Sequence, residues 1–178
     1  MDGHMAAREV ALPAAAFGAL QKTLWREAGP LAAIHSLHTA GYEAGEFMYT
    51  AFFSTLRQPL EKTGERHFWT ALSQFLRSRG WGSVVHTAPH PGVGLLTSAD
   101  WAEAGTGREE QPTCAFSAGL ISSLLTRAAE SPVAVLEVSC RARGNDACGF
   151  AFGSEATIHD LYGALLDGND LQQALAAL

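Results

Sequence analysis

Three cysteines and one glutamate between residues 114 and 148 are the side chains of this sequence best suited to metal chemistry. Cys114, Cys140 and Cys148 are the only cysteines of the chain. Glu137 lies in an apolar run, where a carboxylate is costly to bury unless it meets a partner or a metal ion. Three thiols and one carboxylate supply the four ligands of a closed tetrahedral zinc site. Thiolates also suit zinc better than magnesium or calcium. We therefore predict a structural zinc site at these four residues.

Two alternative roles for the cysteines stay open from the residues alone. Buried cysteines often pack simply as small hydrophobic side chains. Cys140 and Cys148 could also form a disulfide across a hairpin. Neither role accounts for the acidic residue within the strand. Cys114 lies at the start of a predicted helix, where the positive helix end favours the thiolate.

Composition limits the class of protein. The chain has 178 residues, of which 47% are hydrophobic and 17% charged, as in ordinary globular proteins. We expect residues 1–5 to be a cloning remnant and residues 6–178 to form a single domain. The net charge of -6 and the lack of a Lys/Arg cluster argue against direct nucleic-acid binding. No apolar run approaches the roughly 20 residues of a membrane span. The odd cysteine count and the absence of a visible export signal favour a reducing cytoplasm.

Hydrophobic periodicity predicts an α+β fold in which helices pack on a small antiparallel sheet. Helices are expected over residues 13–27, 31–56, 65–79, 114–129 and 155–166, with a short helix at the tail. Strands are expected over residues 83–87, 133–139 and 149–152, and up to residue 96 after a turn at residues 89–92. The helix that begins at Cys114 therefore lies, in sequence, between two pairs of strands.

The second predicted helix is apolar or small on nearly every face, which is typical of a buried helix. Gly41 and Gly45 lie four residues apart and remove side-chain bulk from one face. Glycine weakens a helix, so a specific reason for both is expected. Tight packing against another helix is the favoured reason, and close approach of a ligand is the alternative.

Two segments carry a resemblance to a known family. The first is Cys114-x-Phe116-x-x-Gly119, and the second is Val135-Leu136-Glu137-Val138-Ser139-Cys140-Arg141-Ala142-x-Gly144-x-Asp146-x-Cys148-x-Phe150. They resemble the 4-vinyl reductase domain family, including the sensory domains of phenol-responsive bacterial activators. A weaker resemblance extends to Gly41-x-x-x-Gly45 and Trp101, over roughly residues 30 to 153. It implies a structural zinc at the equivalent Cys, Glu, Cys and Cys, and a dimeric fold similar to the ligand-binding domains related to vesicle-tethering TRAPP subunits.

The same resemblance implies a ligand pocket. Trp101 resembles the pocket tryptophan of the phenol sensors, whereas Leu76 stands where they have a histidine. This difference favours a ligand larger or more apolar than phenol. We expect the pocket between the long second helix, Trp101 and the sheet. The candidate ligand-binding residues are Trp101, Trp81, Phe52, Met48 and His38.

The sequence thus favours a sensory module that binds a hydrophobic or aromatic small molecule, forms a homodimer and performs no catalysis. It has no Gly-x-Ser-x-Gly elbow and no glycine-rich phosphate loop. The alternatives are a tetrapyrrole carrier or enzyme of the 4-vinyl reductase type, and a dimeric scaffold without a ligand. His35 and His38 could bind a metal or haem iron, but one exposed and one buried histidine is the simpler interpretation.

Overall fold

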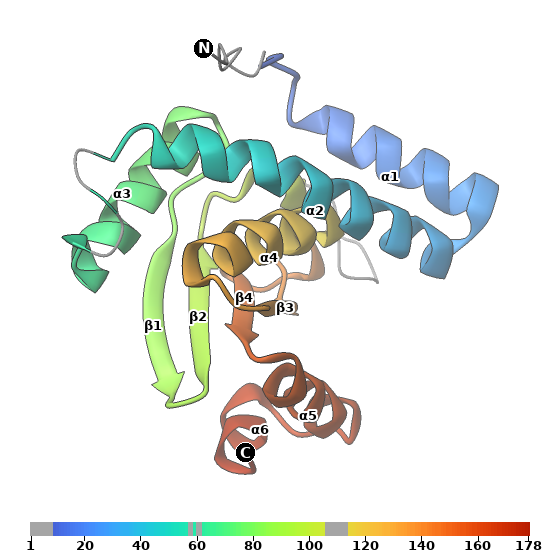
Figure 1. Ribbon diagram of the computed structural model, residues 1–178. Helices are drawn as coiled ribbons and strands as arrows, with labels where there is room; N and C mark the ends of the chain where they lie inside the picture. Colours follow the sequence, from blue (N-terminus) through green and yellow to red (C-terminus); the bar gives the residue numbers. More distant parts are fainter. Residues whose placement is uncertain (1–8, 57–58, 60–61, 106–113) are drawn as a thin grey trace.

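The computed structural model describes residues 9–56, 59, 62–105 and 114–178; the cloning remnant expected at residues 1–5 lies outside these ranges. Figure 1 shows the arrangement of the described elements. The helices are α1 (Ala15–Ala28), α2 (Pro30–Phe53), α3 (Glu65–Ser78), α4 (Ala115–Ala129), α5 (Glu155–Leu166) and α6 (Leu171–Ala176). The strands are β1 (Val85–His90), β2 (Val93–Ser98), β3 (Ala134–Ser139) and β4 (Cys148–Gly153). Two short 3-10 helices are η2 (Ala102–Ala104) and η3 (Arg141–Arg143).

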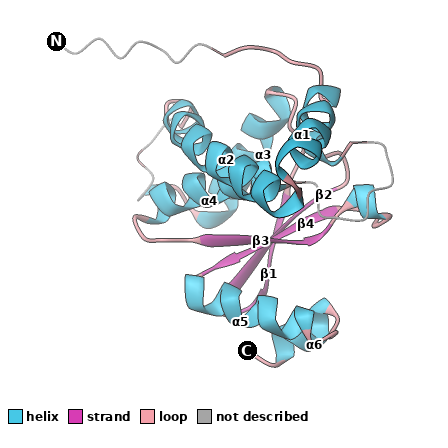
Figure 2. Cartoon of the chain, turned by 90° about the vertical axis from the view of Figure 1, so that its right-hand side faces the viewer, coloured by secondary structure: helices cyan, strands magenta, loops and turns pink. Residues whose placement is uncertain are grey.

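The four strands form one antiparallel sheet in the order β1-β2-β4-β3. The last strand in the sequence is therefore central and pairs with both β2 and β3. Helices α1 to α4 lie on one side of this sheet, and α5 and α6 lie on the other (Figure 2). The α+β prediction is confirmed. The larger hydrophobic core lies between the sheet and the helices α2, α3 and α4, and it includes all three cysteines.

Helices α2 and α4 approach each other at backbone contact. A Cβ atom added to Gly41 would overlap the carbonyl oxygen of Phe116 and lie 2.8 Å from its carbonyl carbon. A Cβ atom on Gly119 would likewise overlap the carbonyl oxygen of His38. A Cβ atom on Gly45 would lie 2.5 Å from the Cβ atom of Ser123. Helix packing is therefore the reason for these glycines, as the sequence favoured over close approach of a ligand.

The expectation of a fully buried second helix was wrong for the outer face of α2. This helix buries Ala33, Leu37, Gly41, Gly45 and Phe52, but Leu31 is 83% exposed and Phe47 is 62% exposed. The helix is flanked by α1 and α4 rather than surrounded, so its apolar outer face is covered by no described element. Apolar residues on all faces are typical of a buried helix, so the periodicity alone could not reveal this exposed face.

The turn expected at residues 89–92 is shorter than predicted. Strand β1 continues through Pro89 to His90, and only residues 91 and 92 form the turn. Proline has no N–H to donate to a neighbouring strand, but it is tolerated on an edge strand. β1 is an edge strand of this sheet. No helix in the described part of the chain is long and apolar enough to cross a membrane.

Candidate functional site

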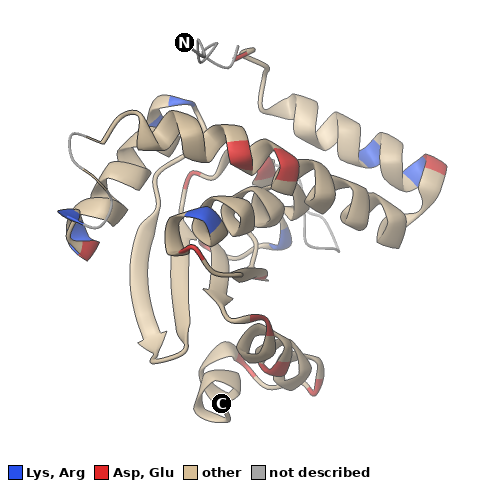
Figure 3. Ribbon diagram, viewed as in Figure 1, with Lys and Arg blue, Asp and Glu red and all other residues tan. Residues whose placement is uncertain are grey.

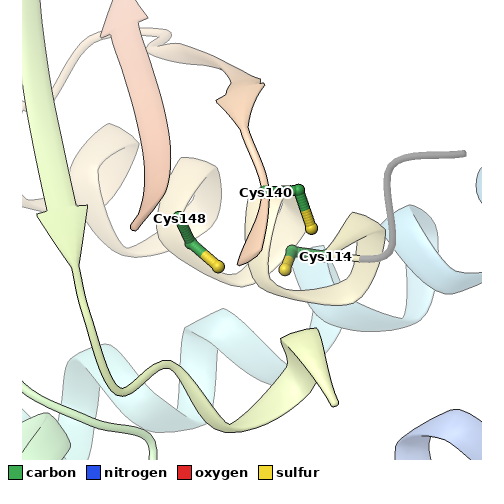
Figure 4. Close-up of side chains that lie close together, drawn as sticks. All are labelled: Cys114, Cys140 and Cys148. Atoms are coloured by element: carbon green, nitrogen blue, oxygen red, sulfur yellow. The ribbon is translucent and has the colours of Figure 1, made fainter. Parts of the chain in front are cut away.

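The three cysteines meet in the core from three different elements. Cys114 is the residue before the first turn of α4, Cys140 directly follows β3, and Cys148 is the first residue of β4. Each is at most 1% exposed. Their Sγ atoms all lie within 4.8 Å of one another, directed into a shared space (Figure 4). Three buried thiols at this separation can bind a metal ion.

A register shift in β3 turns Glu137 and Cys140 toward the same side of the sheet. On this strand Val133 and Val135 pack toward α4, and Val138 packs toward α5. Glu137 shares the alternation of the two valines, whereas Cys140 in a regular strand would face α5. The pairing of β3 with β4 is irregular between Glu137 and Ser139. Such bulges redirect side chains and are frequent next to functional sites.

Glu137 lies beside the thiols with one oxygen atom unused. Its Oε2 atom accepts a hydrogen bond from the backbone N–H of Cys114 at 3.0 Å. Its Oε1 atom is buried and has no hydrogen-bond partner in the described part of the structure. Burial, followed by the adjacent Cys140 thiol, raises the pKa of Glu137 to about 9. Its oxygens lie outside the set of atoms that are all within 4.8 Å of one another, which comprises the three Sγ atoms.

The loop between Cys140 and Cys148 is held by its own hydrogen bonds. The side-chain oxygen of Asn145 accepts from the backbone N–H of Cys140 at 3.0 Å. The carbonyl of Cys140 in turn accepts from the backbone N–H groups of Arg143 and Asn145. Gly144 closes the turn with φ of 93°, a conformation that L residues rarely adopt. The two cysteines are thus fixed relative to each other.

The electrostatics of the site suit a cation. Hydrogen bonds with Cys140 and Cys148, together with burial, raise the pKa of Cys114 well above its ordinary value. Without a cation, these thiols and the buried carboxyl group therefore hold their protons at neutral pH. Metal ligands must lose those protons, so a metal ion would bind here with release of protons. The soft donors and the unused carboxylate oxygen fit zinc.

Glu103 is a buried acidic residue that the sequence analysis did not single out. Its Oε1 atom accepts from the backbone N–H of Phe116 at 3.1 Å, and its Oε2 atom accepts from that of Ser117 at 2.7 Å. The Ser117 hydroxyl also donates to Glu103 and accepts from the indole Nε1–H of Trp101 at 2.8 Å. Glu103 therefore caps α4 beside Cys114. The available sequence signal was one carboxylate in the alanine-rich stretch at residues 101–104.

Burial raises the pKa of Glu103 to about 7, against the opposing effect of its hydrogen bonds from Ser117 and Phe116. The carboxyl group is 4% exposed, and Ser117 is fully buried. The hydrogen bonds thus compensate only part of the cost of placing a charge in the core. This cap links Trp101 to the start of the helix that carries Cys114.

The structure distributes the predicted pocket residues over several places. Met48 and Trp81 line one apolar groove of about 400 Å³, together with Ala51, Phe116 and Leu120. Trp101 lies behind Trp81, with ring centroids 5.8 Å apart, and is 1% exposed. The groove has the size and apolar character of small-molecule sites.

Phe52 and His38 lie outside this groove. Phe52 is 1% exposed and packs edge-on against Phe68 and Phe75. His38 is half-buried at the contact of α2 with α4, ten residues before Met48 and so about 15 Å away along the helix. Burial, with a smaller effect of His35, lowers the pKa of His38. His35 is exposed, in keeping with the simpler interpretation of this histidine pair.

Comparison with known structures supports the fold. The phenol-responsive sensory domain of the transcription activator PoxR, solved with phenol, has a TM-score of 0.68 at 17% identity, covering 83% of this chain and 77% of that one. A TRAPP complex subunit 3 of Naegleria fowleri, covalently bound to palmitic acid, has a TM-score of 0.65 at 13% identity, covering 79% and 91%. These likenesses establish a TRAPP-like fold.

Two further relatives come from Methanocaldococcus jannaschii. A vinyl-4-reductase family protein has a TM-score of 0.54 at 15% identity, covering 85% of this chain and 87% of that one. An uncharacterized protein is 28% identical over 115 residues, which are 65% of this chain. The matched stretch spans about half (54%) of that relative's length.

The family resemblance expected from the cysteine and glutamate pattern is confirmed by a match to the model of the 4-vinyl reductase domain family. The match covers residues 99–154, a shorter range than the resemblance drawn from the sequence, and it contains all three cysteines and Glu137. This segment of the chain is therefore a 4-vinyl reductase domain.

Proposed function

We propose that this chain is a sensory module that binds a small apolar or aromatic molecule and whose fold is stabilised by one structural zinc ion. The observation that carries the proposal is the meeting of three buried thiols, within 4.8 Å, next to a carboxylate oxygen without a partner among the described residues. The fold shared with a phenol-responsive sensory domain supports the sensory role.

Cys114, Cys140, Cys148 and Glu137 would hold the zinc ion. The unused Oε1 atom of Glu137 supports this assignment, because an unpaired buried carboxylate oxygen is otherwise costly. With four protein ligands the zinc would be purely structural, since no coordination position stays open for a substrate. It would join the start of α4 to the β3–β4 hairpin. Structural zinc can contribute on the order of 10 kcal/mol to folding.

Native mass spectrometry of protein purified without added metal tests the zinc site, and we expect one zinc ion per chain. A chelator should lower the melting temperature of the wild type by at least about 10 °C. The Cys148→Ser and Cys148→Ala variants should already melt at the lower temperature and show no response to the chelator. The comparison separates lost metal from altered packing. Metal-free protein that melts like the untreated wild type would refute the zinc site.

The ligand would bind in the groove of Met48 and Trp81. Its lining is mainly apolar, with two aromatic rings, Trp81 and Phe116, that lie parallel at 5.9 Å between centroids. Such a surface offers hydrophobic contact and few hydrogen bonds, so it favours an extended aromatic molecule over phenol. Leu76, which replaces the histidine of the phenol sensors, agrees with this preference.

Titration with 1-naphthol and phenol, followed by tryptophan fluorescence, tests the groove. We expect saturable binding, tighter for 1-naphthol. Ala51 lines the groove and Thr50 is exposed beside it. Ala51→Leu should therefore weaken binding about tenfold or more, whereas Thr50→Leu should leave it within about twofold. Equal effects of the two substitutions, or no saturable binding, would overturn the assignment.

A dimeric scaffold without a ligand is the second candidate. Trp101, 1% exposed, is enclosed by Ser117, Trp81 and Phe150, so side chains fill the space beside it. The exposed apolar residues Leu31 and Phe47 on α2 favour a second copy of the chain as the partner. Native mass spectra that show dimers, combined with no binding of either aromatic probe, would favour the scaffold.

A further inference from the structure

A second hollow lies between α1 and η2. It has a volume of about 570 Å³, and small residues form most of its walls, including Ala15, Gly18 and Ala19 on α1 and Ala102 beside Trp101. Arg141 of η3 closes one side. The hollow differs from the groove of Met48 and Trp81, with which it shares no lining residue.

Gln21 is the only buried residue of α1, at 7% exposure, and it lines this hollow. Its side-chain Nε2 atom is buried and has no hydrogen-bond partner in the described part of the chain. Buried polar groups in folded proteins nearly always find a partner, so an unpaired amide on an otherwise apolar helix face calls for a physical reason. A ligand oxygen in the hollow would supply this partner after rotation of the terminal amide.

The basic side chains of the hollow are placed for an anion. The guanidinium group of the half-buried Arg141 forms no ion pair with a described residue. Lys22 adds a second positive charge to the lining, on the face of α1 where Figure 3 shows basic positions. A guanidinium group binds a carboxylate through two parallel hydrogen bonds.

The acidic side chains of the hollow already have partners. Asp100 accepts from the backbone N–H of Ser83 at 2.8 Å and from the Ser98 hydroxyl at 3.0 Å. Both oxygens of Glu103 accept hydrogen bonds from the first turn of α4. These groups do not occupy Arg141 or Gln21. Their negative charge nevertheless disfavours a doubly charged anion such as phosphate relative to a singly charged one.

We infer that the hollow is a binding site for a small organic carboxylate, held by the guanidinium group of Arg141 and the side-chain amide of Gln21. The apolar body of the ligand lies against the alanine and glycine residues of α1 and η2. This site is independent of the groove proposed for the apolar ligand. The ring of Phe17 packs against Trp81 and Phe116 of the groove, while its neighbour Gly18 lines the hollow.

Isothermal titration of the full chain with benzoate tests the inference. Benzamide, which has a similar shape without the charge, and inorganic phosphate serve as comparison probes. We expect saturable benzoate binding that is at least about tenfold tighter than that of either probe. Equal binding of benzamide, tighter binding of phosphate, or no binding of benzoate would overturn the inference.

Substitutions separate this site from general charge effects. Arg141→Gln should weaken benzoate binding about tenfold or more, whereas Arg143→Gln, at an exposed position of the same 3-10 helix, should change it by less than about twofold. Gln21→Leu should weaken binding severalfold and tests the site without altering the residue next to Cys140. Unchanged affinity in both Arg141→Gln and Gln21→Leu would refute the site. Neither variant should affect 1-naphthol binding, so failure here is distinguishable from failure of the groove.

Discussion

Substituting Gly41 by alanine should weaken the contact between α2 and α4 more than its chemistry suggests. The added methyl group would overlap the carbonyl oxygen of Phe116 and lie 2.8 Å from the carbonyl carbon and 3.1 Å from the backbone nitrogen of Leu120. All three atoms belong to the backbone of α4, so no side-chain rotation relieves the overlap. The two helices must move apart.

The expected free-energy change combines two opposing effects. Overpacking a tight contact costs about 3 kcal/mol when the backbone has to shift. Alanine in place of glycine within a helix contributes about 1 kcal/mol in the other direction. The net loss of stability is therefore about 2 kcal/mol. With a typical urea m-value of about 2 kcal/mol/M, the unfolding midpoint should fall by about 1 M.

Urea unfolding, followed by circular dichroism, measures this shift. Gly163→Ala is the matched control, because Gly163 also lies within a helix (α5) but its added methyl group would meet no atom within 4 Å. This variant should be up to about 1 kcal/mol more stable than the wild type. If Gly41→Ala also proved as stable as the wild type, the close contact between the two helices would be refuted.

Two further predictions concern buried polar groups. Ser117→Ala leaves Glu103 and an indole N–H without their hydrogen bonds and should lower stability by about 2 kcal/mol. Ser123→Ala, equally buried on the same helix but with its hydroxyl unpartnered among the described residues, should be neutral or stabilising, and thermal unfolding of the pair would expose the error if both behaved alike. Burial lowers the pKa of His86 below 6.5, against a smaller opposing effect of a nearby carboxylate, so the unfolded chain binds more protons and stability falls as the pH drops below that value. His86→Phe keeps the stacking on Trp69, at 4.0 Å between ring centroids, and should show a smaller loss between about pH 7.5 and about pH 5.5 in urea midpoints; an unchanged loss contradicts the assignment.

The sequence predicted the elements well because local signals define them. Gly29 and Pro30 separate α1 from α2, and Gly144 with its neighbours marks the turn between Cys140 and Cys148. Apolar alternation located β3 and β4 to within one residue at each end. These features depend on residues close in the chain, which hydrophobic periodicity and turn chemistry describe directly.

Features that depend on distant partners were not predictable. The buried carboxylate of Glu103 is stable only because the first turn of α4 supplies its donors, 13 and 14 residues later. The Glu137 register shift depends on the pairing of β3 with β4. The exposed side of α2 depends on which helices flank it. For the candidate pocket, the residue types were visible, but their division among a groove, the core and a helix contact was not.

The central position of β4 has a consequence for how the chain matures. Until Cys148 and the residues after it leave the ribosome, the β1–β2 hairpin and β3 have no strand to join them, and only two of the three thiols exist. Insertion of this one segment completes the sheet and the thiol cluster in the same event. Metal loading is therefore tied to the end of biosynthesis, and a nascent chain cannot capture the ion early in an incorrect arrangement.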